Sequence, residues 1–453
     1  MLQRVYPIFL ILLFAGILLI PAFINGYPFV YSDTGTYISS GFLGEVPTDR
    51  PISYGLFLRH SSLSYSLWFT VLTQALLVST AIYFFVSFFW KKDENRNLVY
   101  GIAMLFLTFF SSLPWFTDLL MADFFTGLSF ILLMILLLFP PKKIWIFVLL
   151  IWVYWFFTST HLTHAPAHLF LLFGLVLLKW LLPKRLAILT WKSIKLTFVL
   201  VLLNFLFLPS LHYLFNGGFV SSKAGALFML AKNIENGSVQ TYLNDACKGE
   251  NYKLCLYKDS LPKSGPEFLW DPQSALVKIG GWEKNKEEIE AINHHIFFEP
   301  KYLKIYLKHY SASLYQNIKY HRVGEEFISF NENTPPGWEI DAHFKREKEQ
   351  FLNAMQAKDK WTDCLSLLNT LLLPVLIVSV LIVFLLLVFA DPNPPLATFA
   401  LAVLIFSLGN VLVVNIASGG SRYLARVDWL IVLAALLLML DLKPIRNWFK
   451  KTI

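Results

Sequence analysis

Long apolar stretches alternate with short polar ones along most of the chain. A transmembrane helix needs about 17–25 predominantly apolar residues. Ten stretches approach that length, and they begin near Val5, Ser66, Leu98, Phe124, Ile144, Ala165, Leu196, Ser366, Leu396 and Val427. The first is too long for the apolar region of a signal peptide, which indicates a retained anchor. The pattern predicts an all-α polytopic membrane protein with about ten transmembrane helices.

One long polar stretch interrupts this pattern and divides the chain into three parts. Residues 1–215 form an N-terminal membrane core of about seven spans, with outer loops at 26–65 and 114–124. Residues 216–365 form an insert, and residues 366–453 form a C-terminal membrane part of about three spans. The insert is large enough to fold as a small domain. Apolar positions at helical spacing after Pro300 predict that it is mostly helical.

Composition excludes a soluble enzyme. Hydrophobic residues make up 56% of the chain and charged residues 15%, whereas a soluble domain carries about 25% charged residues. The loops on one face hold 15 basic residues against four acidic ones. The basic residues are Arg4, Lys91, Lys92, Arg96, Lys142, Lys143, Lys179, Lys184, Arg185, Lys192, Lys195, Lys443, Arg446, Lys450 and Lys451.

This charge asymmetry predicts the orientation of the chain. Positive residues favour the cytoplasmic side, so both termini are expected in the cytoplasm and the insert on the extracytoplasmic, periplasmic side of a bacterial inner membrane. The net charge of +8 is then a topology signal. We expect membrane lipids as surroundings and no nucleic acid as partner, because nucleic-acid binding needs a basic patch on a soluble face. An outward insert also permits a disulfide between Cys247 and Cys255, with Cys364 free.

The first candidate site is the loop after the first span. It contains Asp33 and Tyr37, followed by Arg50 and Tyr54 in the segment that leads to the second span. A carboxylate held near the outer interface suits a general base, and the tyrosines suit a polar lining. Asp33 can instead cap a short helix that begins at Thr34.

The second candidate is a pair of acids, Asp118 and Asp123, which lie five residues apart among apolar residues between the third and fourth spans. They can bind a divalent cation or a sugar hydroxyl. Equally, Asp118 can cap a helix and Asp123 can be a first-turn acid that the helix dipole favours. The sequence leaves the metal unknown and makes no cofactor certain.

Two further groups contain basic residues. His161, His164 and His168 share a helix face, and we interpret them as polar residues that contact a neighbouring helix rather than as a zinc site. In the segment Ser418-Gly419-Gly420-Ser421-Arg422-Tyr423-Leu424-Ala425-Arg426, the glycine amides and the two arginines suit a phosphate. These arginines can also snorkel to lipid headgroups.

Together, these stretches resemble the GT-C superfamily of polytopic glycosyltransferases. The resemblance is carried by Ser32-Asp33-Thr34 with Tyr37, by Arg50 to Gly55, by the Asp118 and Asp123 loop, and by Gly420-Ser421-Arg422-Tyr423. It covers the membrane core and not the insert. The chain lacks a tight Asp-x-Asp or Glu-x-Asp motif, which leaves metal dependence open.

The resemblance implies a transferase that moves a sugar from a polyprenyl-phosphate carrier to a glycan, lipid or protein acceptor on the extracytoplasmic face, with inversion. It implies Asp33 as the general base, Asp118 and Asp123 as positioning acids, and Arg422, with Arg50 or Arg426, as the phosphate-binding group. Tyr423 would join the polar lining. The alternatives are a transporter or flippase of a lipid-linked solute, an integral-membrane acyltransferase that uses His161 and His164, and a structural partner in the cell envelope.

Overall fold

The chain folds into two compact units of helices. The structure is a computed structural model and describes residues 2–319, 321–325, 327–417, 419–420, 422–445 and 447, without the side chains of residues 2–5, 93 and 94. Unit 1 comprises Met1–Ser221, His321–Asn410 and Leu424–Ile453, and unit 2 comprises Ser222–Tyr320 and Val411–Tyr423. Five loop residues named above lie outside the described residues: Ser418, Ser421, Arg446, Lys450 and Lys451.

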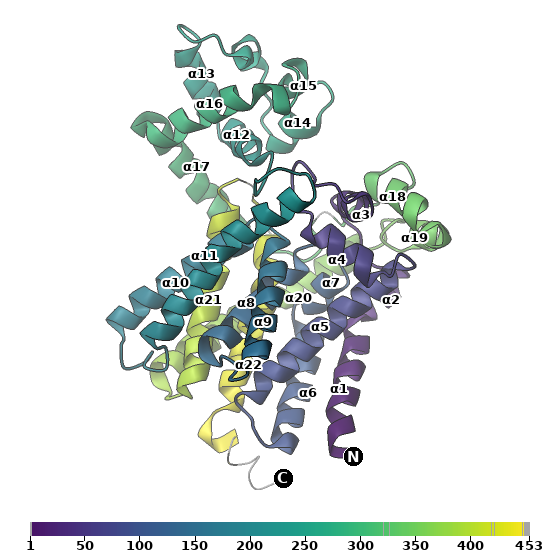
Figure 1. Cartoon of the computed structure of the whole chain (residues 1–453), viewed down its shortest axis with the longest axis vertical. Helices are drawn as coiled ribbons and strands as arrows, with labels where there is room; N and C mark the ends of the chain where they lie inside the picture. Colours follow the sequence, from purple (N-terminus) through teal and green to yellow (C-terminus); the bar gives the residue numbers. More distant parts are fainter. Residues whose placement is uncertain are drawn as a thin grey trace. The chain divides into compact units, whose positions relative to one another are not determined.

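Unit 1 combines a bundle of long helices with several short ones (Figure 1). The long helices are α1 (Leu2–Leu18), α5 (Leu67–Ser87), α6 (Asp93–Phe110), α8 (Phe124–Leu138), α9 (Ile144–Ser159), α10 (His164–Leu181), α11 (Trp191–Leu214), α20 (Thr362–Phe389), α21 (Pro394–Val414) and α22 (Arg422–Leu440). The short ones are α2 (Ile20–Asn25), α3 (Thr34–Leu43), α4 (Ser53–Ser61), α7 (Leu113–Thr117), α18 (Pro335–His343), η3 (Lys345–Glu347) and α19 (Lys348–Asn353).

The described residues form an all-α integral membrane protein, and seven of the helices are long and apolar enough to cross a membrane. These spans are Tyr6–Asn25, Leu67–Ser87, His164–Leu181, Trp191–Leu214, Thr362–Phe389, Pro394–Val414 and Arg422–Leu440. A helix lies at each of the ten predicted positions, but three of them do not reach this standard. The helices α8 and α9 are apolar with only 15 and 16 residues, and α6 begins with the charged residues Asp93, Glu94 and Arg96.

The core of unit 1 explains why α8 is apolar on all sides. Every residue of α8 from Phe124 to Leu137 is buried, and α22 is almost as enclosed. These two helices approach closely, since a Cβ atom at Gly127 would lie 2.4 Å from the Trp429 ring. Burial within protein replaces contact with lipid for α8. In contrast, α20 is mostly exposed, as expected of a helix that faces the bilayer.

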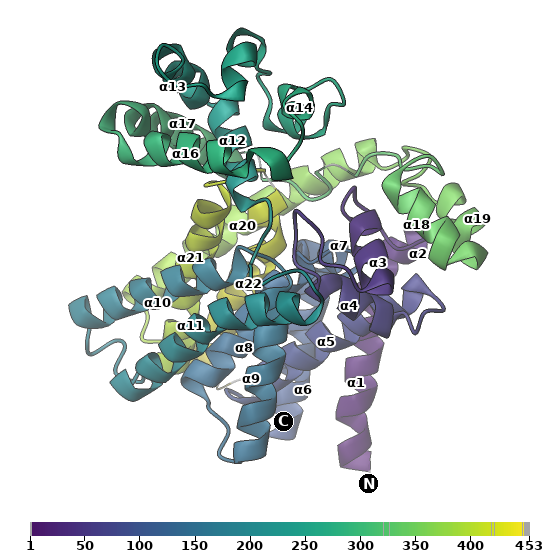
Figure 2. The same ribbon diagram turned by 45° about the horizontal axis from the view of Figure 1, so that its top comes forward.

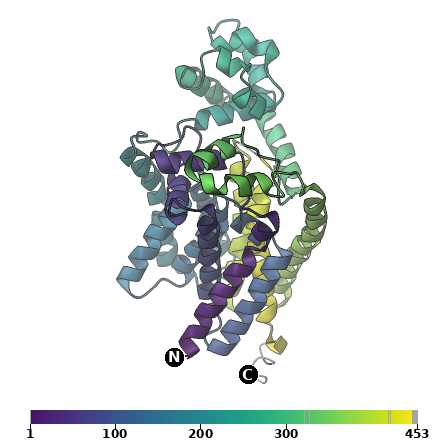
Figure 3. The same cartoon turned by 90° about the vertical axis from the view of Figure 1, so that its right-hand side faces the viewer.

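The short helices lie at one end of the unit 1 bundle. The N-terminal end of α1 and the C-terminal end of α22 lie together at the other end (Figures 1 and 3). Helices α3 and α4 pack so tightly that a Cβ atom at Gly41 would lie 2.1 Å from the Gly55 carbonyl oxygen. Helix α18 lies beside α3 (Figure 2), and a Cβ atom at Gly35 would lie 2.6 Å from the carbonyl carbon of Pro335.

The boundaries of the units differ from those of the predicted insert, 216–365. Residues 321–361, which we call the return segment, belong to unit 1, and Gln356 of this segment hydrogen-bonds Asn25 and Val30. Tyr27, Ser66 and the Leu67 amide all donate hydrogen bonds to the buried Glu347 carboxylate. The polar composition of the return segment therefore reflects contacts with the ends of the membrane helices.

Unit 2 has a hydrophobic core of its own. Its helices are α12 (Gly225–Glu235), α13 (Ser238–Ala246), η1 (Lys253–Ser260), α14 (Gly265–Trp270), α15 (Ala275–Lys278), η2 (Glu283–Asn285), α16 (Lys286–Phe298) and α17 (Pro300–Lys319). Cys247 and Cys255 form a disulfide that ties the end of α13 to η1. Cys364, on α20 of unit 1, is an exposed free cysteine.

Candidate active site

Hydrogen bonds join residues 29–34 to residues 118–120 of unit 1. Phe29 donates its amide to the Asp118 carbonyl at 2.9 Å, and Leu120 donates its amide to the Phe29 carbonyl at 2.9 Å. The Thr34 hydroxyl accepts from the Tyr31 amide and donates to the Leu120 carbonyl at 3.1 Å. These bonds bring the two predicted acidic segments side by side.

The return segment also binds the chain just before Asp33, at Asn25 and Val30. The Gln356 side chain accepts from the Val30 amide at 3.1 Å and donates to the Val30 carbonyl at 2.7 Å, as a neighbouring strand would. Asn25 accepts from the Gln356 amide and from the Trp361 indole, each at 2.8 Å. Because all these groups are buried, each bond satisfies a polar atom that water does not reach. The loop that carries Asp33 is therefore held rigidly.

Asp33 is bound by an arginine and does not cap α3. It occupies the N-cap position, but its side chain makes no capping hydrogen bond. Arg50 Nη1 lies 2.8 Å from Asp33 Oδ2, and the Ser32 hydroxyl donates to Asp33 Oδ1 at 3.2 Å. Arg50 also binds the Asp49 carboxylate. The exposed fraction of the side chain is 24% for Asp33 and 14% for Arg50.

Two buried tyrosines lie behind this cluster. The Tyr37 ring meets the Tyr54 ring edge to face at 4.7 Å, and the Arg50 guanidinium lies 5.3 Å from the Tyr37 ring centre. Burial raises the pKa of Tyr37; the Arg50 cation opposes this rise, while the carboxylates of Asp33 and Asp123 add to it. Burial likewise raises the pKa of Tyr54. Both hydroxyls thus stay protonated. Tyr37 is close enough to Asp33 and Asp123 for both carboxylates to affect its pKa.

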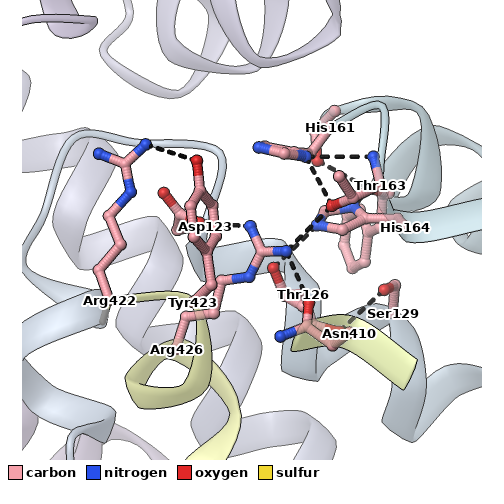
Figure 4. A network of polar contacts seen from close by, with 12 residues as sticks. Asp123, Thr126, Ser129, His161, Thr163, His164, Asn410, Arg422, Tyr423 and Arg426 are labelled. Carbon is pink, nitrogen blue, oxygen red and sulfur yellow. Dashed lines mark hydrogen bonds and ion pairs between the residues drawn. The ribbon is translucent and has the colours of Figure 1, made fainter. Parts of the chain in front are cut away.

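Asp123 and Arg426 form a fully buried ion pair. Arg426 Nη1 lies 2.5 Å from Asp123 Oδ1, and both side chains have an exposed fraction of 0%. Arg426 Nη2 donates to Asn410 at 2.6 Å and to the Thr163 hydroxyl at 3.0 Å (Figure 4). Three segments far apart in the sequence therefore meet at one guanidinium. A charge buried this deeply needs such partners.

The histidines mostly contact neighbouring side chains of the core. His164 is buried and exchanges a hydrogen bond with the Thr126 hydroxyl at 2.8 Å (Figure 4). His161 contacts the Thr163 hydroxyl at 2.9 Å, and its ring stacks on that of His164. His168 contacts the Tyr154 hydroxyl at 2.9 Å. Within the described ranges, no group of three or more His, Cys, Asp or Glu side chains could hold a metal ion.

Asp118 is bound by the backbone of another helix. Its Oδ2 accepts a hydrogen bond from the Ala22 amide at 2.7 Å, which satisfies a free amide in the first turn of α2. Asp118 therefore caps a helix from a different segment of the chain. Its Oδ1 is buried and has no hydrogen-bond partner among the described residues. Burial raises the pKa of Asp118 well above its ordinary value, although the Ala22 amide counteracts this effect.

Arg422 and Tyr423 begin α22 and belong to unit 2. Arg422 Nη2 donates to the Tyr423 hydroxyl at 3.0 Å, and the guanidinium lies 4.8 Å from the Tyr423 ring centre. Of the two arginines one helical turn apart, Arg426 contacts polar groups of unit 1, and Arg422 contacts the tyrosine beside it.

One cluster was missed by sequence reasoning. Asp428 on α22 accepts hydrogen bonds from the Ser112 hydroxyl and from His321 Nε2, the latter at 2.7 Å, and the His321 and Asp428 side chains are almost completely buried. His321 opens the return segment, so this bond ties that segment to the bundle. The signal was present, because an acid inside an apolar span is a candidate by default.

Comparison with known proteins adds no family to this picture. No family model, curated protein or solved structure matches the chain. The resemblance to the GT-C superfamily stays a prediction from short motifs, and a function has to be argued from the residues and their arrangement.

Proposed function

We propose that this chain is an integral-membrane glycosyltransferase of the GT-C type. In this proposal it transfers a sugar from a polyprenyl-phosphate carrier to an acceptor on the extracytoplasmic face. The observation that carries the proposal is the state of Asp33: it is a partly exposed carboxylate on a rigid loop, bound to Arg50 and backed by Tyr37. A general base needs access to its substrate and a fixed position.

The proposed topology has about ten crossings. The seven long spans would be joined by α6, α8 and α9, the three helices that fall short of the standard length or hydropathy. Both termini would then be cytoplasmic, and the loop that carries Asp33 and residues 222–319 of unit 2 would be extracytoplasmic. In support, the N-terminal end of α1 and the C-terminal end of α22 lie at one end of unit 1, opposite the short helices (Figure 3). We place the protein in a bacterial inner membrane.

In the proposed reaction, Asp33 takes the proton of the acceptor hydroxyl. Its two oxygens each bind one partner, and a carboxylate offers about four acceptor positions, so positions are left for an acceptor hydroxyl. The acceptor oxygen would attack the anomeric carbon while the bond from that carbon to the phosphate oxygen breaks. The bonding electrons leave with the polyprenyl phosphate, and the hydroxyl proton passes to Asp33. Attack opposite the leaving group inverts the anomeric centre.

The carrier phosphate requires a cation, and the three candidate arginines differ in their contacts. Arg426 is enclosed and paired with Asp123, so binding a phosphate there would break a buried ion pair. Arg50 already contacts the carboxylates of Asp33 and Asp49. The resemblance implies Arg422 for the phosphate. We assign Asp118 and Asp123 to holding the loop and the bundle rather than to a metal.

The test compares two carboxylates that share Arg50. In a strain that lacks this gene, mass spectrometry of envelope glycans and glycolipids would identify the missing sugar, and plasmid-borne variants would be scored by its return. We expect Asp33→Asn to lower transfer by at least about 100-fold, the smaller end of the range for general-base catalysis. Asp49→Asn, the matched control, should keep transfer within about tenfold of the wild type, because Arg50 retains Asp33.

Immunoblotting of membranes would establish that both variants are inserted at equal levels. An Asp33→Asn variant with wild-type transfer would refute the base assignment. Equal loss in Asp33→Asn and Asp49→Asn would mean that both act only through the position of Arg50. If the deletion strain shows no missing sugar on any glycan or lipid, the glycosyltransferase proposal itself fails.

A further inference from the structure

Unit 2 contains a cavity of about 190 Å³ that the proposed transfer reaction does not use. It lies wholly within that unit, between the end of α12 and the middle of α17, and Asn415 contributes to its lining. Pockets for drug-sized ligands occupy about 300–1,000 Å³. This cavity therefore suits a smaller molecule, on the scale of a single sugar ring.

One wall is a face of α17 that is held in place by hydrogen bonds. The Tyr310 hydroxyl donates to the Leu412 carbonyl at 2.8 Å, and the Tyr306 hydroxyl donates to the Ile416 carbonyl at 3.4 Å. Asn415 accepts from the Ser313 hydroxyl at 2.8 Å and donates to the Tyr310 carbonyl at 2.9 Å. Residues at this helical spacing share one face. The wall is thus pre-organised, which lowers the entropic cost of binding a ligand.

The opposite wall carries a charged pair and an amide. Lys232 Nζ lies 2.7 Å from Glu235 Oε1, and the other oxygen of Glu235 accepts from the Gly265 amide at 3.3 Å. Asn236, the next residue, is buried and accepts from the Ser238 amide at 2.9 Å. These side chains present donors and acceptors side by side with no net charge.

The lining narrows the class of ligand. A phosphate would need an excess of cations, but Lys232 is matched by Glu235. A metal ion would need more ligands of its preferred types than Glu235 and His309, the one carboxylate and one histidine among the described lining residues. A wholly apolar ligand would leave the polar groups without partners. The combination that remains is tyrosine faces beside mixed donors and acceptors, which matches the apolar ring faces and the hydroxyls of a sugar.

We propose that this cavity of unit 2 binds a neutral sugar residue. The rings of Tyr306 and Tyr310 contact the sugar face, and Glu235, Asn236 and Asn415 hydrogen-bond its hydroxyls. Exposed His309 and Gln316 close the outer rim. This inference does not depend on the proposed transferase activity, and binding at the cavity can be measured without any turnover.

The test is saturation-transfer NMR on the full-length protein in phosphatidylcholine nanodiscs, since many detergents carry sugar headgroups. The probes are the methyl glycosides of glucose, galactose, mannose and N-acetylglucosamine. We expect at least one to bind the wild type. Ala312→Trp, which fills the cavity from α17, should abolish that binding, whereas Ser311→Trp, on the neighbouring exposed position outside the lining, should leave it unchanged.

A second variant guards against misfolding by a large side chain. His309→Ala combined with Gln316→Ala removes two exposed rim groups and should weaken binding by about tenfold, the equivalent of about 1.4 kcal/mol. Asp33→Asn should bind the glycosides as the wild type does. The proposal is overturned if no glycoside binds, if Ala312→Trp binds as well as Ser311→Trp, or if inorganic phosphate displaces the bound sugar.

Discussion

Two aspartate–arginine pairs in unit 1 have the same chemistry and different surroundings. Asp33 and Arg50 lie 2.8 Å apart with exposed fractions of 24% and 14%, whereas Asp123 and Arg426 lie 2.5 Å apart with no exposure. Asp33 and Arg50 are partly exposed, so a substrate can reach them. The buried pair has taken two ions out of water, and its partners Asn410 and Thr163 belong to the surrounding helices. The degree of burial therefore indicates which pair is available for chemistry and which pair holds the helices together.

The largest expected effect is on the buried pair. Asp123→Asn or Arg426→Met should each lower the free energy of unfolding by about 3–5 kcal/mol, because the partner is left as an uncompensated buried charge. The double variant Asp123→Leu with Arg426→Met removes both charges and should be more stable than either single variant. Unfolding by SDS of the protein purified in micelles would measure all three.

Arg59→Met is the control for this experiment, because Arg59 is exposed and its described hydrogen bond is one long contact to the Gly41 carbonyl. Its unfolding free energy should stay within about 0.5 kcal/mol of the wild type. Additive losses at Asp123 and Arg426 would show that the two side chains do not act as a pair.

Much of the fold could be predicted from the hydropathy of the sequence. Helices such as α11 and α20 are continuous apolar stretches, and a bilayer requires its spanning segments to satisfy their own backbone groups, so their length and position follow from composition. The return segment was not accessible in this way. It is polar, and Gln356 reaches Val30 across 326 residues of sequence. Hydropathy does not predict contacts between residues that lie so far apart in the sequence.

The sequence allowed the single residues of the candidate site to be predicted, but it did not show which residue pairs with which. Asp33 and Arg50 stood out as ionisable groups near an interface, but their ion pair depends on the close approach of α3 and α4. Asp123 meets Arg426 across 303 residues. The sequence left Asp118 open between a ligand and a helix cap, and in the fold it caps α2 through the Ala22 amide. Residue type predicts which groups need a partner, and the fold decides which partner each one finds.

Asp118 is a buried acid with no ion-pair partner among the described residues, and we expect its replacement to have an effect of intermediate size on stability. Its pKa is raised by burial above the ordinary value of 3.8, so the folded protein holds this proton more tightly than the unfolded chain does. Stability from this group is therefore greatest below about pH 4 and falls as the pH rises toward the raised pKa. Asp118→Asn has no charge to bury, so it should gain about 1–3 kcal/mol over the wild type at neutral pH.

Unfolding of Asp118→Asn and the wild type at about pH 4 and about pH 8 would test this expectation. The difference between the two proteins should widen at the higher pH, in favour of the variant. A difference that is independent of pH would mean that Asp118 is not held protonated by its surroundings. A loss comparable to that of Asp123→Asn would place Asp118 with the buried ion pairs.

The smallest effect is expected at the exposed pair. Asp33→Asn and Asp49→Asn should each change the unfolding free energy by about 1 kcal/mol or less, because Arg50 keeps one carboxylate partner in either variant. The double variant removes both carboxylates that Arg50 contacts in the described structure, and Arg50 is largely buried, so its loss should exceed the sum of the single losses. The same SDS unfolding assay measures all three variants. If Asp33→Asn alone costs as much as Asp123→Asn, Asp33 is part of the framework of unit 1, and burial is not what separates the two pairs.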